Sequence, residues 1–179
     1  MKDLSLHILD IAENSINAEA KNIEIGINEN LNKDLLTLKI TDDGIGMDNK
    51  MKEKVTDPFV TTRKTRKIGL GIPLLKSSAE SANGKLLIDS AKGKGTTITA
   101  TFQLSHIDRK PLGKISDTIL MLVAGNPDIN FKFLHQKNGS KFIFDSKKYK
   151  DELIASGADS TGILIKLKKY LKEYNNTLK

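Results

Sequence analysis

Two short segments of alternating hydrophobic residues constrain the fold of this chain more than any other feature. Residues 22–28 read NIEIGIN and residues 35–40 read LLTLKI, so isoleucine or leucine recurs at every second position. Because successive side chains of a β-strand point to opposite faces, each segment is predicted to be a strand with one apolar face. Apolar residues at helical spacing over residues 4–19 predict a helix just before them.

The remaining elements follow from the same periodicities. Residues 43–68 have weak periodicity and predict a long loop with at most one short helix, whereas 69–82 predicts a helix with Pro73 in its first turn. Further strands are predicted at 85–91 and 96–104. After residue 107 the pattern predicts a helix at 114–126, a β-hairpin over 129–146 around Asn138-Gly139, and helices at 147–156 and 161–174.

Length and composition limit the kind of protein. The 179 residues suffice for one domain (1–107) and an addition (108–179), and there is no cysteine. The longest apolar run, 119–124, is far shorter than a membrane span, so a soluble cytoplasmic protein is expected. The net charge is +7, but the 29 Lys and Arg are scattered along the chain and aromatic residues make up only 5%, which argues against nucleic acid as a partner.

The segment TDDGIGMD, residues 41–48, follows directly after the second strand. A buried carboxylate must accept hydrogen bonds, and the exocyclic amino group of adenine is a suitable donor. Asp42 would then hold the base, and Gly44 and Gly46 would let it approach the backbone closely. The alternative is a polar turn that closes a hairpin.

The first helix carries a polar stripe that has two interpretations. Asp10, Glu13, Asn14 and Asn17 are spaced so that they share one face, which Asp3 and His7 continue. An asparagine carbonyl is a hard oxygen donor suited to Mg²⁺, which makes Asn14 a candidate metal ligand. Asp10, one turn earlier, could accept a proton from an attacking water or hydroxyl. The alternative is an ordinary solvated face.

Two glycine-containing segments could meet phosphate. The segment IGLGIP, residues 68–73, opens a helix whose free amide groups form a natural anion site. The preceding loop supplies the cations Arg63, Lys64, Arg66 and Lys67. The segment KGKGTT, 92–97, leads into Thr96, whose hydroxyl can donate and accept hydrogen bonds. Taken singly, the basic loop is more simply read as solvent-exposed and the segment KGKGTT as a plain hairpin turn.

In this order the four motifs resemble the GHKL superfamily of ATP-binding proteins, over residues 4–104. That superfamily includes histidine kinases, type II topoisomerases, mismatch-repair ATPases and heat-shock chaperone ATPases. The resemblance implies an α/β two-layer sandwich of the Bergerat type, with helices on one face of a mixed sheet, and it implies ATP or ADP with Mg²⁺ as ligands.

The resemblance also implies a role for each matching position. Asn14 would bind Mg²⁺, Asp42 the adenine amino group, and Asp10 would stand where hydrolysing members have a general base. Residues 57–68 would form a mobile lid. The other implied nucleotide-binding residues are Gly44, Gly46, Met47, Thr62, Lys64, Lys67, Gly69, Leu70, Gly71 and Thr96.

The chain departs from the family pattern in ways that leave its activity open. Asp10 replaces the usual glutamate, and the lid has cations where extra glycines are common. We expect a phosphotransfer regulatory module of the kinase type; the alternatives are a nucleotide-gated partner-binding module without useful turnover, and a slow ATPase. Within residues 108–179, the stretch 112–131 resembles the tail of small stand-alone ATP-binding proteins of anaerobic bacteria. Residues 108–179 are predicted to bind a partner protein or to extend the core, and homodimerisation stays open.

Overall fold

The computed structural model describes residues 1–56 and 71–178. In chain order its elements are α1 (Leu4–Asn17), β1 (Asn22–Asn30), β2 (Leu35–Asp42), α2 (Asn49–Lys54), α3 (Gly71–Glu80), β3 (Leu86–Ser90), β4 (Thr96–Gln103), α4 (Ile115–Gly125), β5 (Asn130–Lys137), β6 (Ser140–Asp145), α5 (Ser146–Ala155) and α6 (Ser160–Thr177). Every helix and strand predicted from the sequence over these residues is present, with ends shifted by one to three residues.

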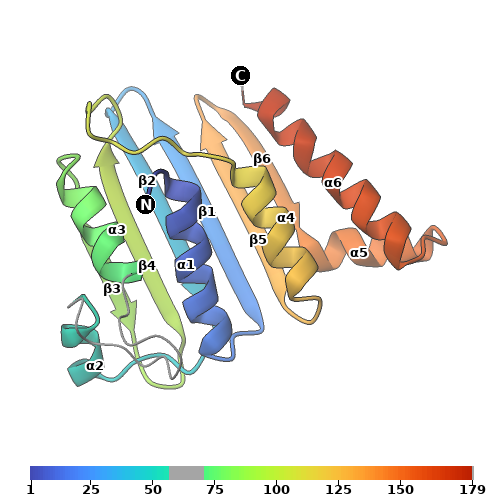
Figure 1. The fold of residues 1–179 in the computed structure, drawn as a ribbon, viewed down its shortest axis with the longest axis horizontal. Coiled ribbons are helices and arrows are strands. Elements are labelled where there is room, and N and C mark those ends of the chain that lie inside the picture. Colours follow the sequence, from blue (N-terminus) through green and yellow to red (C-terminus); the bar gives the residue numbers. More distant parts are fainter. Residues whose placement is uncertain (57–70, 179) are drawn as a thin grey trace.

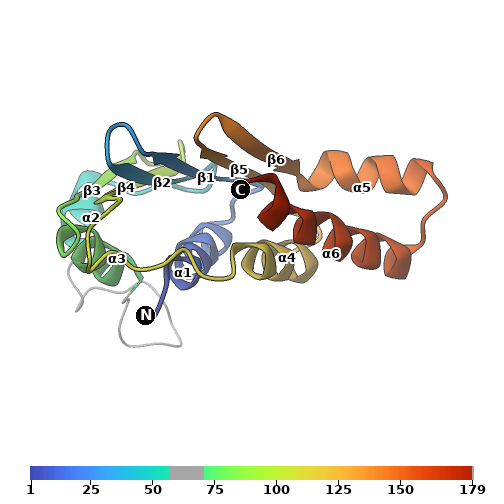
Figure 2. The same ribbon diagram turned by 90° about the horizontal axis from the view of Figure 1, so that it is seen from above.

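The strands form a mixed six-stranded sheet in the order β3-β4-β2-β1-β5-β6, in which only the β1–β5 pair is parallel among the described strands. Figures 1 and 2 show α1, α3, α4 and α6 on one face of this sheet, while α5 continues outward from β6. The predicted two-layer α/β sandwich is therefore confirmed.

The alternation read from the sequence decides which strand face is covered. Ile25 of β1 lies opposite Ile40 of β2, which in turn lies opposite Ile98 of β4, and all three side chains are buried beneath the helices. The residues between them, such as Lys39 and Thr99, point to the other face. Burying a side chain of this size contributes roughly 1.5–3 kcal/mol, so this one-sided core fixes the register of the sheet.

Residues 108–179 are joined to the rest of the chain through the sheet and through α1. Strand β5 pairs with β1 along its whole length, from Asn22 opposite Asn130 to Glu29 opposite Lys137. The amides of Leu4 and Ser5, which have no partner within the first turn of α1, donate to the carbonyl oxygens of Pro111 and Leu112 at 2.9 Å. Buried residues of α4, β5, β6 and α6 belong to the same hydrophobic core as α1 and β1.

The polar stripe predicted on α1 is not uniform. Asp3 caps the helix, since its carboxylate accepts from the Leu6 amide at 3.1 Å. His7 is only 2% exposed, and burial, followed by the positive N-terminus, lowers its pKa to about 4. The part of the stripe that stays accessible therefore begins at Asp10. Among the described helices, none combines the length and the apolar character that crossing a bilayer requires.

Candidate nucleotide-binding site

Asp42, the last residue of β2, is buried and its carboxylate is oriented by three donors. Oδ2 accepts from the Ser15 hydroxyl of α1 at 2.7 Å. Oδ1 accepts from the amide of Gly44 at 3.0 Å and from the amide of Thr96 at 3.2 Å. Since a carboxylate has about four acceptor positions, one position remains for a donor that enters the site. This is the arrangement that recognition of an amino group requires.

Glycine is required around this carboxylate because three backbone segments pack against one another. A Cβ added at Gly44 would lie 2.5 Å from the Ala18 carbonyl oxygen. Gly46 has φ +65° and a Cβ there would lie 2.1 Å from the Ala91 carbonyl oxygen. Gly95 has φ +77° and a Cβ there would lie 1.9 Å from the carbonyl oxygen of Asp42 itself. No side chain fits at any of these positions.

Ser90, at the end of β3, hydrogen-bonds to both glycine-containing segments, the one with Gly44 and Gly46 and the one with Gly95. Its hydroxyl accepts from the Met47 amide at 2.8 Å and donates to the Gly95 carbonyl at 2.9 Å. It also lies 2.9 Å from the hydroxyl of Thr96. Strand pairing already sets Thr96 opposite Asp42, and Ser90, which the motifs did not identify, links Met47 to Gly95 and Thr96.

The other end of the candidate site is formed where α3 begins beside α1. A Cβ built on Gly71 would lie 3.2 Å from Cβ and 3.5 Å from Oδ2 of Asp10, and 3.6 Å from the side-chain nitrogen of Asn14. The N-terminus of a helix attracts anions through its free amides and its dipole. A carboxylate, a side-chain amide and a helix N-terminus thus converge, although α1 and α3 are far apart in the sequence.

The residues at this end suit Mg²⁺ held together with phosphate. Mg²⁺ takes few protein ligands and keeps phosphate oxygens and waters as the rest. Asn14 supplies one amide beside the helix N-terminus. In the described parts of the chain, no group of three or more His, Asp or Glu side chains could hold a metal by itself. Asn14 therefore fits a Mg²⁺ site in which phosphate and water supply most of the ligands, and not a site formed by protein ligands alone.

Five predicted site residues, namely Thr62, Lys64, Lys67, Gly69 and Leu70, lie outside the described residues. The other predicted site residues fall into the two groups above, and both groups include residues of α1. Sequence reasoning missed Ser15 and Ser90, and it assigned no role to Asp43. The Asp43 carboxylate accepts from the amides of Lys21 and Asn22 at 2.7 and 2.8 Å, so it fastens the start of β1. Ser15 gave one signal: it is a polar residue on the apolar face of a predicted helix, and a buried hydroxyl needs a partner.

Comparison with known families agrees with this geometry. Residues 2–106 match the family described as histidine kinase-, DNA gyrase B- and HSP90-like ATPases. The chain belongs to this family. Its first 106 residues are therefore an ATP-binding domain of the GHKL type, as the motif order predicted.

Individual relatives of this ATPase domain are sensor kinases. Sensor histidine kinase WalK of Bacillus subtilis (strain 168) is 39% identical over 88 residues, which are 46% of this chain and 14% of that protein. Sensor protein kinase WalK of Staphylococcus haemolyticus (strain JCSC1435) is 33% identical over 93 residues, 49% of this chain and 15% of that protein. The chain thus spans about one-seventh of the length of these relatives.

One solved structure extends the likeness beyond the ATPase domain. The crystal structure of the N-terminal domain of a DNA repair protein matches with a TM-score of 0.58 at 19% identity. The match covers 80% of this chain and 52% of that chain. At this identity the likeness concerns the fold alone, and it supports the two-layer architecture described above.

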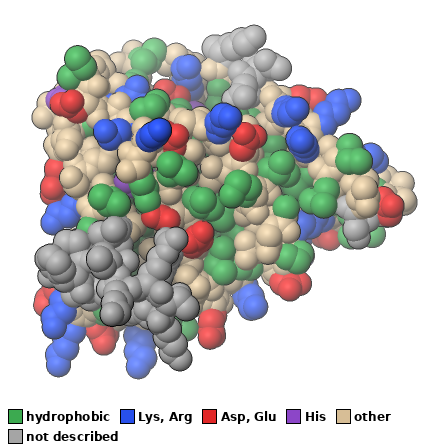
Figure 3. Space-filling model, viewed as in Figure 1, with side chains coloured by type: hydrophobic (Ala, Val, Ile, Leu, Met, Phe, Trp, Pro, Cys, Tyr) green, Lys and Arg blue, Asp and Glu red, His purple; other side chains and the backbone are tan. Residues whose placement is uncertain are grey.

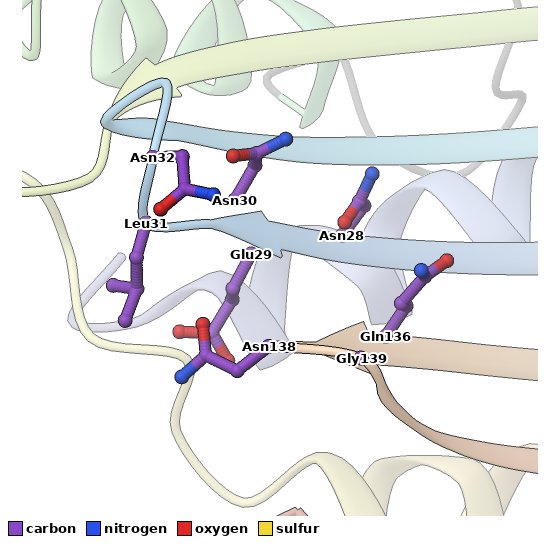
Figure 4. A pocket seen from close by; sticks show the side chains of 8 residues that line it. All are labelled: Asn28, Glu29, Asn30, Leu31, Asn32, Gln136, Asn138 and Gly139. Carbon is purple, nitrogen blue, oxygen red and sulfur yellow. The ribbon is translucent and has the colours of Figure 1, made fainter.

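A hollow of about 220 Å³ lies at the opposite end of the β1–β2 hairpin from Asp42 (Figure 4). It is lined mainly by amide side chains of the two strand turns, together with Glu29. The Glu29 carboxylate is hydrogen-bonded to His135, whose Nε2 lies 2.9 Å from it. The other ring nitrogen of His135, Nδ1, lies 2.5 Å from the Tyr174 hydroxyl. The hydrogen bond from His135 lowers the pKa of Glu29. This chain of contacts fastens α6 to β5 and β1.

Proposed function

We propose that the chain binds ATP with Mg²⁺ and transfers the γ-phosphoryl group to a partner protein as a cytoplasmic regulatory module. The observation that carries the proposal is the close approach of Gly71 to Asp10 and Asn14. This approach brings a carboxylate, a side-chain amide and a helix N-terminus together, and these groups would serve as base, metal ligand and anion-binding end. Adenine would be held about Asp42, whose carboxylate keeps one acceptor position.

The proposed transfer needs one proton acceptor. A hydroxyl oxygen of the partner bonds to the γ-phosphorus while the bond from that phosphorus to the β–γ bridging oxygen breaks, and ADP leaves. The Asp10 carboxylate takes the hydroxyl proton. The amides at the start of α3 would stabilise charge on the phosphoryl oxygens. Mg²⁺, when bound, would neutralise phosphate charge, and Asn14 would orient it.

A second candidate function is a nucleotide-gated binding module without useful turnover. It is favoured by one feature of the site, because Asp10 is one methylene shorter than the glutamate expected at this position. A shorter side chain holds its carboxylate farther from the partner's hydroxyl group, whose proton it would have to accept. ATP would then change the affinity for a partner through the ordering of a segment, and not through chemistry.

Replacement of Asp10 by asparagine separates the two candidates. With γ-labelled ATP and the protein that co-purifies with the chain, the wild type is expected to label that partner. Asp10→Asn should lower the labelling rate by about 100-fold or more, which is the usual contribution of a general base. The dissociation constant for ATP should change by less than about threefold. Tight ATP binding by the wild type, with neither transfer nor hydrolysis, would leave the second candidate in place.

Replacement of Asn14 by alanine should remove the effect of Mg²⁺ on ATP binding. The wild type is expected to bind ATP about tenfold or more tightly when Mg²⁺ is present, since the ion links the phosphates to the protein. Asn14→Ala should bind ATP equally with Mg²⁺ and with EDTA in a calorimetric titration. Asn17→Ala, an exposed asparagine on the same helix, is the matched control and should keep the Mg²⁺ effect. If both variants behave alike, Asn14 is not the ligand.

A further inference from the structure

The net positive charge of the chain is concentrated in its C-terminal part. Residues 1–107 contain 15 Lys and Arg against 14 Asp and Glu, whereas residues 108–179 contain 14 against 8. Six of the seven net positive charges therefore belong to the segment that follows the ATPase domain. A charge asymmetry of this kind indicates an acidic partner for one part of a protein.

Helix α6 presents part of this charge on a single face. Ile165, Lys168, Lys169 and Lys172 are spaced at i, i+3, i+4 and i+7, which places them along one side of the helix. All four side chains are exposed, and Leu167 and Leu171 on the opposite side are 1% exposed. We call these four residues the α6 lysine face. It points away from the core that α6 helps to build.

Among the residues that the structure describes, the lysines of the α6 lysine face form no ion pair, although the exposed Glu173 lies one turn after Lys169. Lys172 stands one turn from both Lys168 and Lys169, and like charges at this spacing weaken a helix by roughly 0.2–0.5 kcal/mol per pair. Glu173 at i+4 from Lys169 offsets only part of this repulsion, and an acidic surface laid against the three lysines would offset the rest.

Aliphatic side chains accompany the lysines at the outer end of the helix. Ile165 is 64% exposed, and Leu164 beside it is 47% exposed. Ile154, at the end of α5, is 60% exposed. Figure 2 shows that α5 and the first half of α6 project beyond the sheet, and Figure 3 shows hydrophobic and basic side chains side by side over this projection. An apolar end next to a row of cations is a two-part docking surface.

We infer that the α6 lysine face, with Leu164 beside Ile165 at its outer end, docks an acidic amphipathic helix of a partner protein. Carboxylates of that helix would lie along the three lysines, and its aliphatic residues would cover Leu164 and Ile165. The inference rests on the proposed function, since it names the surface through which the regulated partner is held. It does not depend on nucleotide chemistry, because α6 packs against β6, the edge strand three strands away from β2, which carries Asp42.

Other polyanions fit this surface less well. Among the described residues, no large exposed hydrophobic side chain is aromatic, whereas membrane-surface helices commonly use Trp or Phe, and single-stranded nucleic acid needs aromatic platforms. The cations on this face are all lysine, without the planar arginine fork that favours phosphate. Carboxylates together with leucine-like side chains match both parts of the surface.

A binding titration with a defined probe tests the inference. The probe is a synthetic amphipathic helix of about 20 residues with glutamate on one face and leucine at its border, labelled for fluorescence anisotropy. The full chain without nucleotide is expected to bind it, and affinity should fall as salt rises. Lys168→Glu, Lys169→Glu and Lys172→Glu combined should weaken binding at least about tenfold. Ile165→Asn alone should weaken it about threefold to tenfold.

The matched control combines Lys39→Glu, Lys85→Glu and Lys141→Glu, which change net charge equally on exposed lysines elsewhere. It should bind within about twofold of the wild type. The inference is overturned if the probe does not bind, if the control loses as much affinity, or if the α6 variant loses affinity for anionic vesicles or duplex DNA and not for the peptide. Asp42→Asn should bind the probe normally, so a failure of ATP binding stays distinct from a failure of docking.

Discussion

Asp42→Asn is expected to weaken ATP binding by at least about 100-fold. The change removes the negative charge that the adenine amino group would meet, and a hydrogen bond to a charged group contributes roughly 1.5–3 kcal/mol. It also replaces one carboxylate oxygen by an NH2 donor: either Oδ2, which accepts from the Ser15 hydroxyl, or Oδ1, which accepts from the Gly44 and Thr96 amides. Calorimetry with ATP measures the loss, and circular dichroism checks that the fold is kept.

Asp43→Asn is the matched control for this experiment. Asp43 is the adjacent carboxylate, it is exposed, and its partners are Lys21 and Asn22 at the start of β1. Its variant should bind ATP within about threefold of the wild type, even where it lowers stability. An Asp42→Asn protein that binds ATP as well as Asp43→Asn would remove Asp42 from the adenine site.

Gly95→Ala is expected to destabilise the chain by more than about 4 kcal/mol. The left-handed backbone at φ +77° costs a residue with a Cβ roughly 1–2 kcal/mol. The new Cβ would also meet the carbonyl oxygen of Asp42 at 1.9 Å, so β2 or the turn has to move. Since the displaced residue is the proposed adenine ligand, ATP binding should be lost together with stability. Urea unfolding measures the first effect, and nucleotide titration the second.

Gly93→Ala separates strain from crowding. Gly93 has the same φ of +77°, but a Cβ there would meet nothing within 4 Å. This variant should lose only the roughly 1–2 kcal/mol of backbone strain and should keep ATP binding. If Gly95→Ala costs no more than Gly93→Ala, the close packing of the turn against Asp42 is not what requires glycine there.

Local periodicity was sufficient to predict the elements of this fold. The alternation in 22–28 and 35–40 and the helical spacing in 4–19 predict β1, β2 and α1 because each signal lies within one element. The parallel pairing of β5 with β1 could not be predicted in the same way. It joins residues more than 100 positions apart, and neither strand contains a signal that names its neighbour.

The candidate site likewise contains residues that local sequence predicts and residues that only the packing of distant segments reveals. Asp42 could be proposed because a carboxylate followed by glycines is visible within a few residues. The approach of Gly71 to Asp10 and Asn14 was reached only through the family resemblance, since it depends on how α3 packs against α1. Ser90 was missed because a serine hydroxyl in a strand has no pattern of its own, and the one signal of Ser15, a polar residue on an apolar helix face, does not name its partner. Their roles follow from burial and from the partners that burial demands.

The strand that follows α4 has a consequence for any attempt to isolate the ATPase domain. Ending the chain at residue 107 would remove β5. Strand β1 would then be an edge strand whose backbone amides and carbonyls lack their partners. The truncation would also remove the carbonyls of Pro111 and Leu112 from the start of α1. Such an edge strand is a template for strand exchange between molecules. The shortened protein should therefore self-associate. Low solubility of that protein would result from the loss of β5 and not from a defect in the nucleotide-binding site.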